Sequence, residues 1–197
     1  ITFGKKLGYC AGGATDTLAY DFVAAFLLFF LTDFAGVNPI WAGTILTIGV
    51  LWDMATDPII GNLADKTKTR FGKKRIWLLV AIVPLFISYA LLFTKIDTMG
   101  ESTRNVYFLI MTLLFWTSYT CFSIPYYSMG ASMTPSNDER TKMRMLAMII
   151  QYIGVFFSTV APPMFASFFM KAGADNYHAW HYVGLLEACL CIITLII

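Results

Sequence analysis

The chain has 197 residues, of which 58% are hydrophobic and only 13% are charged, and its formal net charge is +2. An average soluble domain has about 25% charged residues, so this composition excludes an ordinary soluble domain and indicates an integral membrane protein. Aromatic residues make up 16% of the chain, which suits lipid-facing surfaces and the interfacial belts of a bilayer.

Hydrophobic runs predict an all-α integral membrane fold, a bundle of six transmembrane helices in a single unit, 1–197. A helix needs about 20 apolar residues to cross the hydrocarbon core. Runs of this kind cover residues 11–32, 40–64, 76–94, 106–132, 143–170 and 178–197. Short connections between these runs predict that neighbouring helices are antiparallel.

The basic residues predict how the bundle is oriented. Apart from Lys95, Arg104 and Lys171, they lie before the first run, between the second and third, or between the fourth and fifth. Basic loops remain in the cytoplasm, so we expect both ends of this segment there, in a multi-pass protein of the cell membrane. Nucleic-acid binding is the alternative explanation of the basic segment 66–75, but the flanking spans favour orientation, and no nucleic-acid partner is expected.

The first run carries Asp16 within Gly12-Gly13-Ala14-Thr15-Asp16-Thr17. Asp16 is a candidate acceptor for substrate hydroxyls, although it could instead be an acid near the interface that pairs with backbone or with a lysine. Asp21 is five residues further, about 140° around a helix, so the two acids are not expected to share one face.

The second run contains two aspartates, Asp53 and Asp57, four residues apart and followed by Pro58. A spacing of four places both carboxylates on one helix face, and a charge at bilayer depth costs at least about 2.5–3.5 kcal/mol. The pair therefore predicts a cation or proton site, the alternative being a structural salt bridge to another helix. Pro58 also frees the carbonyl of Met54, which could coordinate a cation.

The fourth run contains a polar and aromatic segment that includes a proline. It reads Tyr119-Thr120-Cys121-Phe122-Ser123-Ile124-Pro125-Tyr126-Tyr127-Ser128. Hydroxyls and flat rings are what a sugar site uses, and ordinary aromatic packing is the alternative. Gln151 and Tyr152 in the fifth run and the acid Glu187 in the sixth are further polar groups inside the spans.

The sequence contains no motif typical of an enzyme. Hydrolase, zinc-protease and nucleotide-binding signatures are missing, and the four cysteines lack metal-ligand spacing. His178 and His181 could bind a metal, but packing beside Trp180 explains them more simply. We expect no enzyme activity, no cofactor and no metal beyond a transported cation.

Several segments together resemble one family of transporters. The segment 61–75 resembles the loop between helices two and three of the major facilitator superfamily, in the lengthened form of the glycoside–pentoside–hexuronide:cation symporters, the melibiose permease group. It reads Gly61-Asn62-Leu63-Ala64-Asp65-Lys66-Thr67-Lys68-Thr69-Arg70-Phe71-Gly72-Lys73-Lys74-Arg75. Asp53-x-x-x-Asp57-Pro58, Ile124-Pro125-Tyr126 and Asp138-Glu139-Arg140 fit the same group.

The resemblance implies a secondary transporter that moves a sugar or glycoside with Na⁺, Li⁺ or H⁺ by alternating access. It implies that Asp53, Asp57, Thr120 and Thr56 form the cation site, with Thr56 replacing an asparagine associated with cation selectivity. It places Asp16 and Tyr127 at the sugar, Tyr127 standing where the group has a stacking tryptophan. Tyr119 lies beside them, and Ser123 stands where the group has a second sugar-binding aspartate. The resemblance also predicts a cytoplasmic gate made of Asp65, Arg70, Lys73, Arg75 and Arg140.

Two further departures concern basic residues near the sugar. Thr15 replaces a lysine, and the helix-five arginine has no clear match, since Arg144 is expected close to the loop. The family has about twelve helices in two halves, so this chain would supply the N-terminal half. We expect a truncated chain or one that pairs with another half, from the same parent chain or a second copy.

Two rival functions remain open. One is a related symporter for a lysolipid or another solute, and the other is a membrane scaffold that transports nothing. The cost of burying facing carboxylates argues against a scaffold, which would gain nothing from them.

Overall fold

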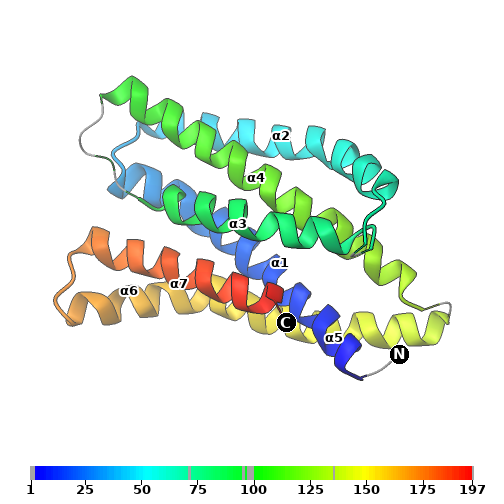
Figure 1. The fold of residues 1–197 in the computed structure, drawn as a ribbon. Coiled ribbons are helices and arrows are strands. Elements are labelled where there is room, and N and C mark those ends of the chain that lie inside the picture. Colours follow the sequence, from blue (N-terminus) through cyan, green and yellow to red (C-terminus); the bar gives the residue numbers. More distant parts are fainter. Residues whose placement is uncertain (1–2, 71, 95, 97–99, 135, 197) are drawn as a thin grey trace.

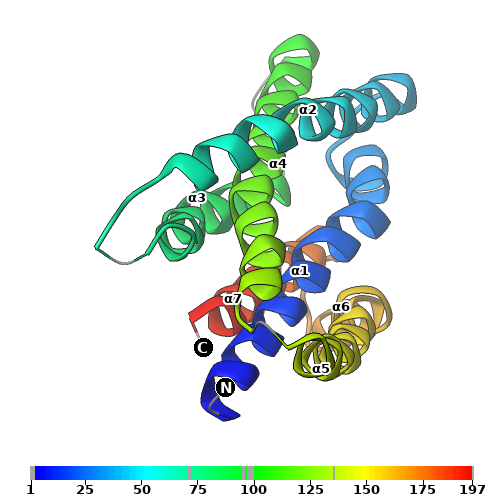
Figure 2. The same cartoon turned by 90° about the vertical axis from the view of Figure 1, so that its right-hand side faces the viewer.

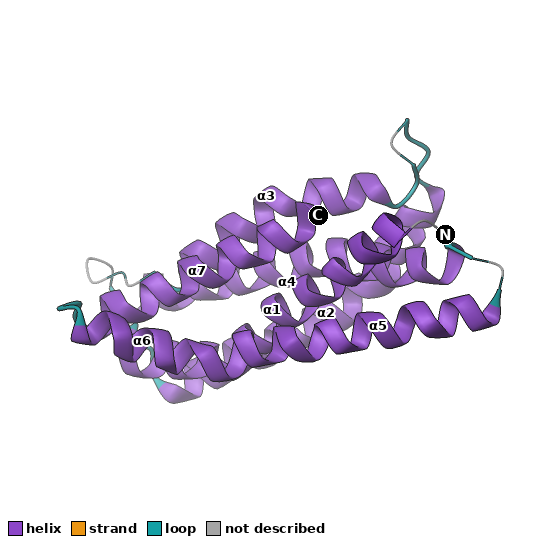
Figure 3. Ribbon diagram, turned by 90° about the horizontal axis from the view of Figure 1, so that it is seen from below, coloured by secondary structure: helices purple, strands orange, loops and turns teal. Residues whose placement is uncertain are grey.

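The computed structural model describes the whole chain except residues 1–2, 71, 95, 97–99, 135 and 197, so Phe71 and Lys95 lie outside the described residues. All regular structure in the described part is helical (Figure 3), which confirms the expected all-α fold. The helices are α1 (Phe3–Phe29), α2 (Pro39–Lys66), α3 (Arg75–Leu92), α4 (Glu101–Ser132), α5 (Asn137–Val155), α6 (Ala161–Lys171) and α7 (Asn176–Ile196).

Two π-helical turns continue the helices. The turn η1 (Phe30–Phe34) extends α1, and η2 (Phe156–Val160) joins α5 to α6 into one rod. The prolines at 162 and 163 come one residue after η2 and have no N–H to give to the preceding turn. A π-helical turn absorbs this interruption without ending the rod.

Five helical segments are long and apolar enough to cross a membrane within the described residues. They are Lys6–Phe34, Arg75–Leu92, Glu101–Gly130, Asn137–Lys171 and Asn176–Leu195. The segment α2 is not among them, although the sequence predicts a sixth span there. With 28 residues it is about 42 Å long, and Asp53 and Asp57 lower the mean hydropathy of its apolar part.

Helices α1 and α4 form the centre of the bundle. Helix α4 packs against α2 and α3, while α1 packs against α5 and α7 (Figures 1 and 2). Aromatic side chains fill the core between them. Phe22 stacks on Tyr89 and meets Phe93 at a tilt, and Tyr89 meets Phe115 edge to face. Polar residues on α1 and α4 can therefore contact helices on both sides of the bundle.

The helix ends gather at two opposite ends of the bundle. The beginnings of α1, α3 and α5 lie at one end, together with the last turns of α2 and α4 (Figure 1). The beginnings of α2, α4 and α7 lie at the opposite end. Most of the basic residues belong to the first end, which is the arrangement that a cytoplasmic orientation of this end requires.

Candidate functional site

Asp16 is the centre of a buried hydrogen-bond network that joins three helices. Its side chain is only 7% exposed. The hydroxyl of Tyr119 donates to Oδ1 at 2.7 Å, and Tyr127 donates to Oδ2. The amide Nε2 of Gln151 lies 3.4 Å from the same Oδ2. The predicted sugar residues Asp16, Tyr119 and Tyr127 are thus in direct contact, and Gln151 joins them from α5.

The close approach of α1 to its neighbours depends on small residues. A Cβ on Gly12 would lie 2.6 Å from the ring of Tyr126, and a Cβ on Gly13 would lie 3.0 Å from Gln151. The hydroxyl of Tyr126 donates to the Tyr9 carbonyl at 2.9 Å, which fixes α4 against α1 one turn away. Side chains larger than hydrogen at these two positions would push Asp16 away from its donors.

Asp53 contacts the hydroxyl of Thr120. The Oγ1 of Thr120 lies 2.6 Å from Asp53 Oδ1 and 2.9 Å from the carbonyl of Trp116. A threonine hydroxyl has a single proton, so it can serve only one of these acceptors at a time. The indole of Trp52 donates to Thr117 at 2.9 Å and adds a second link between α2 and α4.

The other predicted cation-site groups are arranged around Asp53. Asp57 is half-buried one turn further along α2, and within the described residues it has no hydrogen bond or ion pair. The Thr56 hydroxyl donates instead to the carbonyls of Trp52 and Asp53, at 3.0 and 3.1 Å, so it does not point a proton at either carboxylate. Pro58 lies inside α2, so the Met54 carbonyl lacks its helical donor.

Helix α4 connects the two acids through adjacent residues. Tyr119 reaches Asp16 on α1, and Thr120 reaches Asp53 on α2. Consecutive residues of a helix point about 100° apart, so one turn of α4 can face α1 and α2 at the same time. A shift or rotation of this turn would alter both contacts together.

Arg144 is a candidate that the sequence did not assign to the site. Its guanidinium lies 5.1 Å from the ring centroid of Tyr127, within the range of a cation–π contact. Arg144 and Gln151 are seven residues apart on α5, and two helical turns put them on one face. That spacing is the signal in the sequence that could have linked Arg144 to the site.

The remaining residues predicted for the substrate site and the gate take no part in the contacts described above. Ser123 is buried at 6% exposure. For Asp65, Arg70, Lys73 and Arg75 no ion pair is present within the described residues. Arg140 donates to the carbonyl of Thr134 at 3.1 Å, and near it Lys6 lies 3.8 Å from Glu139. The gate therefore stays a prediction.

Two other polar groups belong to the interior of the bundle. His181 Nδ1 lies 3.0 Å from the Phe93 carbonyl, consistent with a packing role. Glu187 is fully buried, and both of its carboxyl oxygens lack a hydrogen-bond partner in the described part of the chain. No group of three or more His, Cys, Asp and Glu side chains that could hold a metal ion occurs there either.

Comparison with known proteins identifies the family. Residues 8–197 match the model of a family described as MFS/sugar transport protein. The chain belongs to this family. The family description and the names of the matching relatives are those of transporters. The expectation that the chain is not an enzyme is therefore confirmed.

Three relatives illustrate the range of the family. The uncharacterized symporter YnaJ of Bacillus subtilis is 29% identical over 98% of this chain and 42% of its own length. The sodium-dependent lysophosphatidylcholine symporter 1-A of Danio rerio is 31% identical over 81% of this chain and 30% of its own. The isoprimeverose transporter of Lactiplantibacillus pentosus is 25% identical over 98% and 40%. The chain thus spans less than half the length of these relatives.

Proposed function

We propose that the chain is the N-terminal half of a secondary active transporter that couples the symport of a sugar or glycoside to Na⁺, Li⁺ or H⁺. One observation carries the proposal: adjacent residues of α4, Tyr119 and Thr120, contact the acid of α1 and the acid of α2. A substrate at Asp16 and a cation at Asp53 would therefore act on the same helical turn.

The cation site would be built from oxygen atoms of α2 and α4. Carboxylates of Asp53 and Asp57, the freed Met54 carbonyl and the Thr120 hydroxyl are the proposed ligands, and unwound or freed carbonyls commonly coordinate Na⁺ in transporters. When a cation neutralises Asp53, the Thr120 proton can return to the Trp116 carbonyl, 2.9 Å away. The lone pairs of Thr120 would then face the cation.

The substrate site would use the network around Asp16. A sugar hydroxyl that donates to Asp16 can take the place of one of its present donors, and the 37% exposed Tyr127 offers a ring for stacking. Neutralisation of Asp53 and Asp57 lowers the cost of closing the site around the sugar. Cation and substrate would then strengthen each other's binding, as linkage requires.

Alternating access would need a second half. In transporters built from repeats the site lies between the two halves near the membrane midplane, and this chain covers 42% of its relative YnaJ. The partner half belongs either to the same parent chain or to a second copy. The proposed orientation places the N-terminus of this segment and its basic connections in the cytoplasm.

A lysolipid symporter is the second candidate. Its support is the 31% identity to a lysophosphatidylcholine symporter, which exceeds the 25% identity to the isoprimeverose transporter. The polar surroundings of Asp16, with two hydroxyls and an amide, favour a ligand that is rich in hydroxyl groups.

Uptake into proteoliposomes tests the proposal on the full-length parent. We expect an inward Na⁺, Li⁺ or H⁺ gradient to drive accumulation of labelled isoprimeverose or a related glycoside, with Asp53→Asn abolishing it. Gradient-driven uptake of lysophosphatidylcholine alone would favour the second candidate. If neither solute responds to any of the three gradients, the proposal is wrong.

A further inference from the structure

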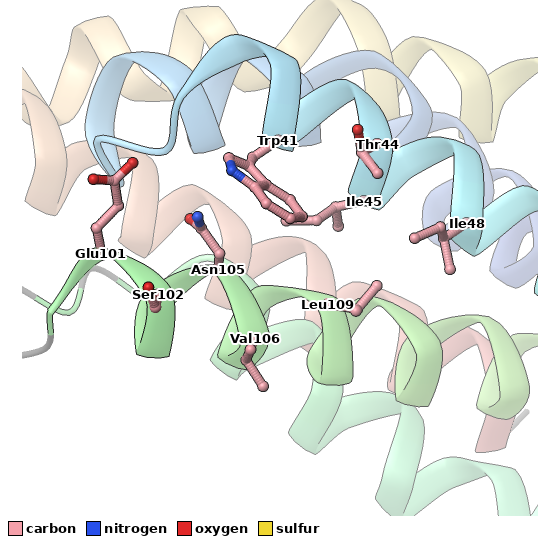
Figure 4. Close-up of a pocket in the computed structure, with 9 residues that line it drawn as sticks. All are labelled: Trp41, Thr44, Ile45, Ile48, Glu101, Ser102, Asn105, Val106 and Leu109. Carbon is pink, nitrogen blue, oxygen red and sulfur yellow. The ribbon is translucent and has the colours of Figure 1, made fainter.

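A cavity lies between α2 and α4, at the end of the bundle where both helices begin (Figure 4). Its volume is about 420 Å³, within the range of pockets that hold small ligands, about 300–1,000 Å³. It is lined by Trp41, Thr44, Ile45, Ile48, Glu101, Ser102, Asn105, Val106 and Leu109. The lining ends at Ile48 on α2, about 7.5 Å along the helix from Asp53, and includes neither Asp16 nor Asp53, so the cavity is distinct from the site at these two acids.

Asn105 marks the cavity as a built site. Its side chain is only 8% exposed, and its Oδ1 is buried without a hydrogen-bond partner in the described part of the chain. An unpaired buried polar atom destabilises the folded protein, because it has lost its hydrogen bond to water. Figure 4 shows the amide of Asn105 and the indole of Trp41 directed into the space between the two helices. A ligand that donates a hydrogen bond to Oδ1 would remove this destabilisation.

Other polar groups of the lining can accept hydrogen bonds too, while the Ser102 hydroxyl can donate or accept and the Trp41 indole N–H can only donate. Thr44 already donates its proton to the Ile40 carbonyl at 2.8 Å, so only its lone pairs remain for a ligand. Glu101 supplies a carboxylate from the first turn of α4. No Lys or Arg belongs to the lining residues, and the neighbouring Arg104 is held by the Gly36 carbonyl at 2.6 Å. This charge distribution disfavours an anion.

The apolar part of the lining provides a flat surface. Trp41 is 52% exposed, and its indole face is available for stacking against the apolar face of a sugar ring. A quaternary ammonium could also stack there, but it has no donor for the Asn105 oxygen. An inorganic cation would find a single carboxylate in the lining. A neutral ligand with several hydroxyl donors satisfies the indole and the acceptors together.

We propose that this cavity is an outer subsite that binds the sugar ring of a glycoside before it reaches Asp16. The location on the outer side and the choice of a glycoside rest on the proposed function and orientation. The acceptors in the lining are observed independently of both. A sugar ring held here would stack on Trp41 and donate hydroxyl protons to Asn105 and Glu101. Binding is expected to be weak, because the cavity is open and supplies few contacts.

The test uses the full-length parent carrying Asp16→Asn, so that the proposed inner site is disabled. Nitrophenyl β-xyloside and nitrophenyl β-glucoside are the probes, and their binding is followed by quenching of tryptophan emission and by equilibrium dialysis. We expect a weak saturable phase to remain in this background. Asn105→Leu should weaken it at least fivefold, whereas Asn176→Leu, which changes an exposed asparagine at the start of α7, should leave it unchanged.

Trp41→Leu is a second variant for the case in which Asn105→Leu does not fold, since Trp41 is half exposed and its removal leaves the core intact. It should abolish the weak phase by dialysis. The inference is overturned if no binding remains in the Asp16→Asn background, if both variants bind like their parent, or if tetramethylammonium competes with the glycosides. Loss of gradient-driven uptake with the weak phase retained would reject the proposed function but not this subsite.

Discussion

Asp16 is held inside the bundle by three side chains that donate to it or lie within reach of donating. Tyr119 is the more buried of the two tyrosines that donate to Asp16, at 9% exposure, whereas Tyr127 is 37% exposed and lies under the guanidinium of Arg144. This difference assigns the two tyrosines different tasks. Tyr119 orients the carboxylate from within, and Tyr127 is the group that a substrate can displace or stack upon.

Removal of the Tyr119 hydroxyl should therefore destabilise the protein. Tyr119→Phe leaves Asp16 Oδ1 without its 2.7 Å donor, and an unpaired buried acceptor costs about 1–3 kcal/mol. Thermal unfolding of the purified parent measures the loss. The matched control is Tyr107→Phe on the same helix, whose hydroxyl donates to the Leu91 carbonyl at a more exposed position and should matter less. Equal effects of the two variants would contradict this role of Tyr119.

Thr120 offers a cleaner test of the cation site. Thr120→Val keeps the shape but removes the oxygen that lies 2.6 Å from Asp53. We expect cation affinity to fall about tenfold, the loss of roughly one hydrogen bond to a charged group, and Thr120→Ser to restore it. Titration with Na⁺, Li⁺ or H⁺ by calorimetry provides the measurement.

The control for this substitution lies two turns earlier on α4. The hydroxyl of Thr112 is fully buried and has no partner in the described part of the chain. Thr112→Val should leave cation affinity unchanged and should not lower stability. A tenfold effect of Thr112→Val, or none of Thr120→Val, would count against the assignment.

At the level of helices, the contact between α2 and α4 depends on one glycine. A Cβ on Gly49 would lie 2.7 Å from Trp116 Nε1 and 2.9 Å from Thr112 Cγ2. Gly49→Ala should therefore push the two helices apart, lower the unfolding temperature and weaken cation binding by separating Asp53 from Thr120. Gly43→Ala on the same helix meets nothing within 4 Å. Its expected effect is neutral or stabilising, because alanine is the better helix former by about 1 kcal/mol.

Hydrophobic runs predict which segments are helical better than where the helices begin. The run near residue 143 marks the apolar part of the fifth helix, yet α5 begins at Asn137. Hydropathy reports what lies in the bilayer, whereas the helix continues through polar turns as long as its hydrogen bonds can form. This difference explains why Arg144 was expected near the loop. It lies two turns inside α5, beside Tyr127.

Individual site residues are easier to predict from the sequence than the contacts between them. The family resemblance predicts Asp53 and Thr120 as cation-site residues, and the structure places these two in contact between α2 and α4. That the pair binds a cation stays a prediction. The bond from Gln151 to Asp16 and the adjacent contacts of Tyr119 and Thr120 depend on how helices pack, which no local pattern contains. The π-helical turn η2 cannot be predicted from hydropathy either, because hydropathy does not distinguish it from an α-helix.

At the scale of the whole molecule, a large part of the surface is apolar. On α2 the exposed side chains include Leu51, Met54 and Ile59, and on α5 and α6 they include Tyr152 and Phe168. A membrane protein exposes such groups to lipid or to another helix bundle. The length of the relatives and these surfaces agree with the proposal that a second half completes the transporter.

The most direct test is the linkage between substrate and cation in the full-length parent. The dissociation constant of a nitrophenyl glycoside is measured by calorimetry without cation and at saturating cation, and the cation constant is measured with and without glycoside. The proposed coupling through α4 predicts equal ratios of about 5–150-fold in both directions, falling close to 1 in Asp53→Asn and in Thr120→Val. Ratios that persist in the folded Asp53→Asn protein would contradict the account.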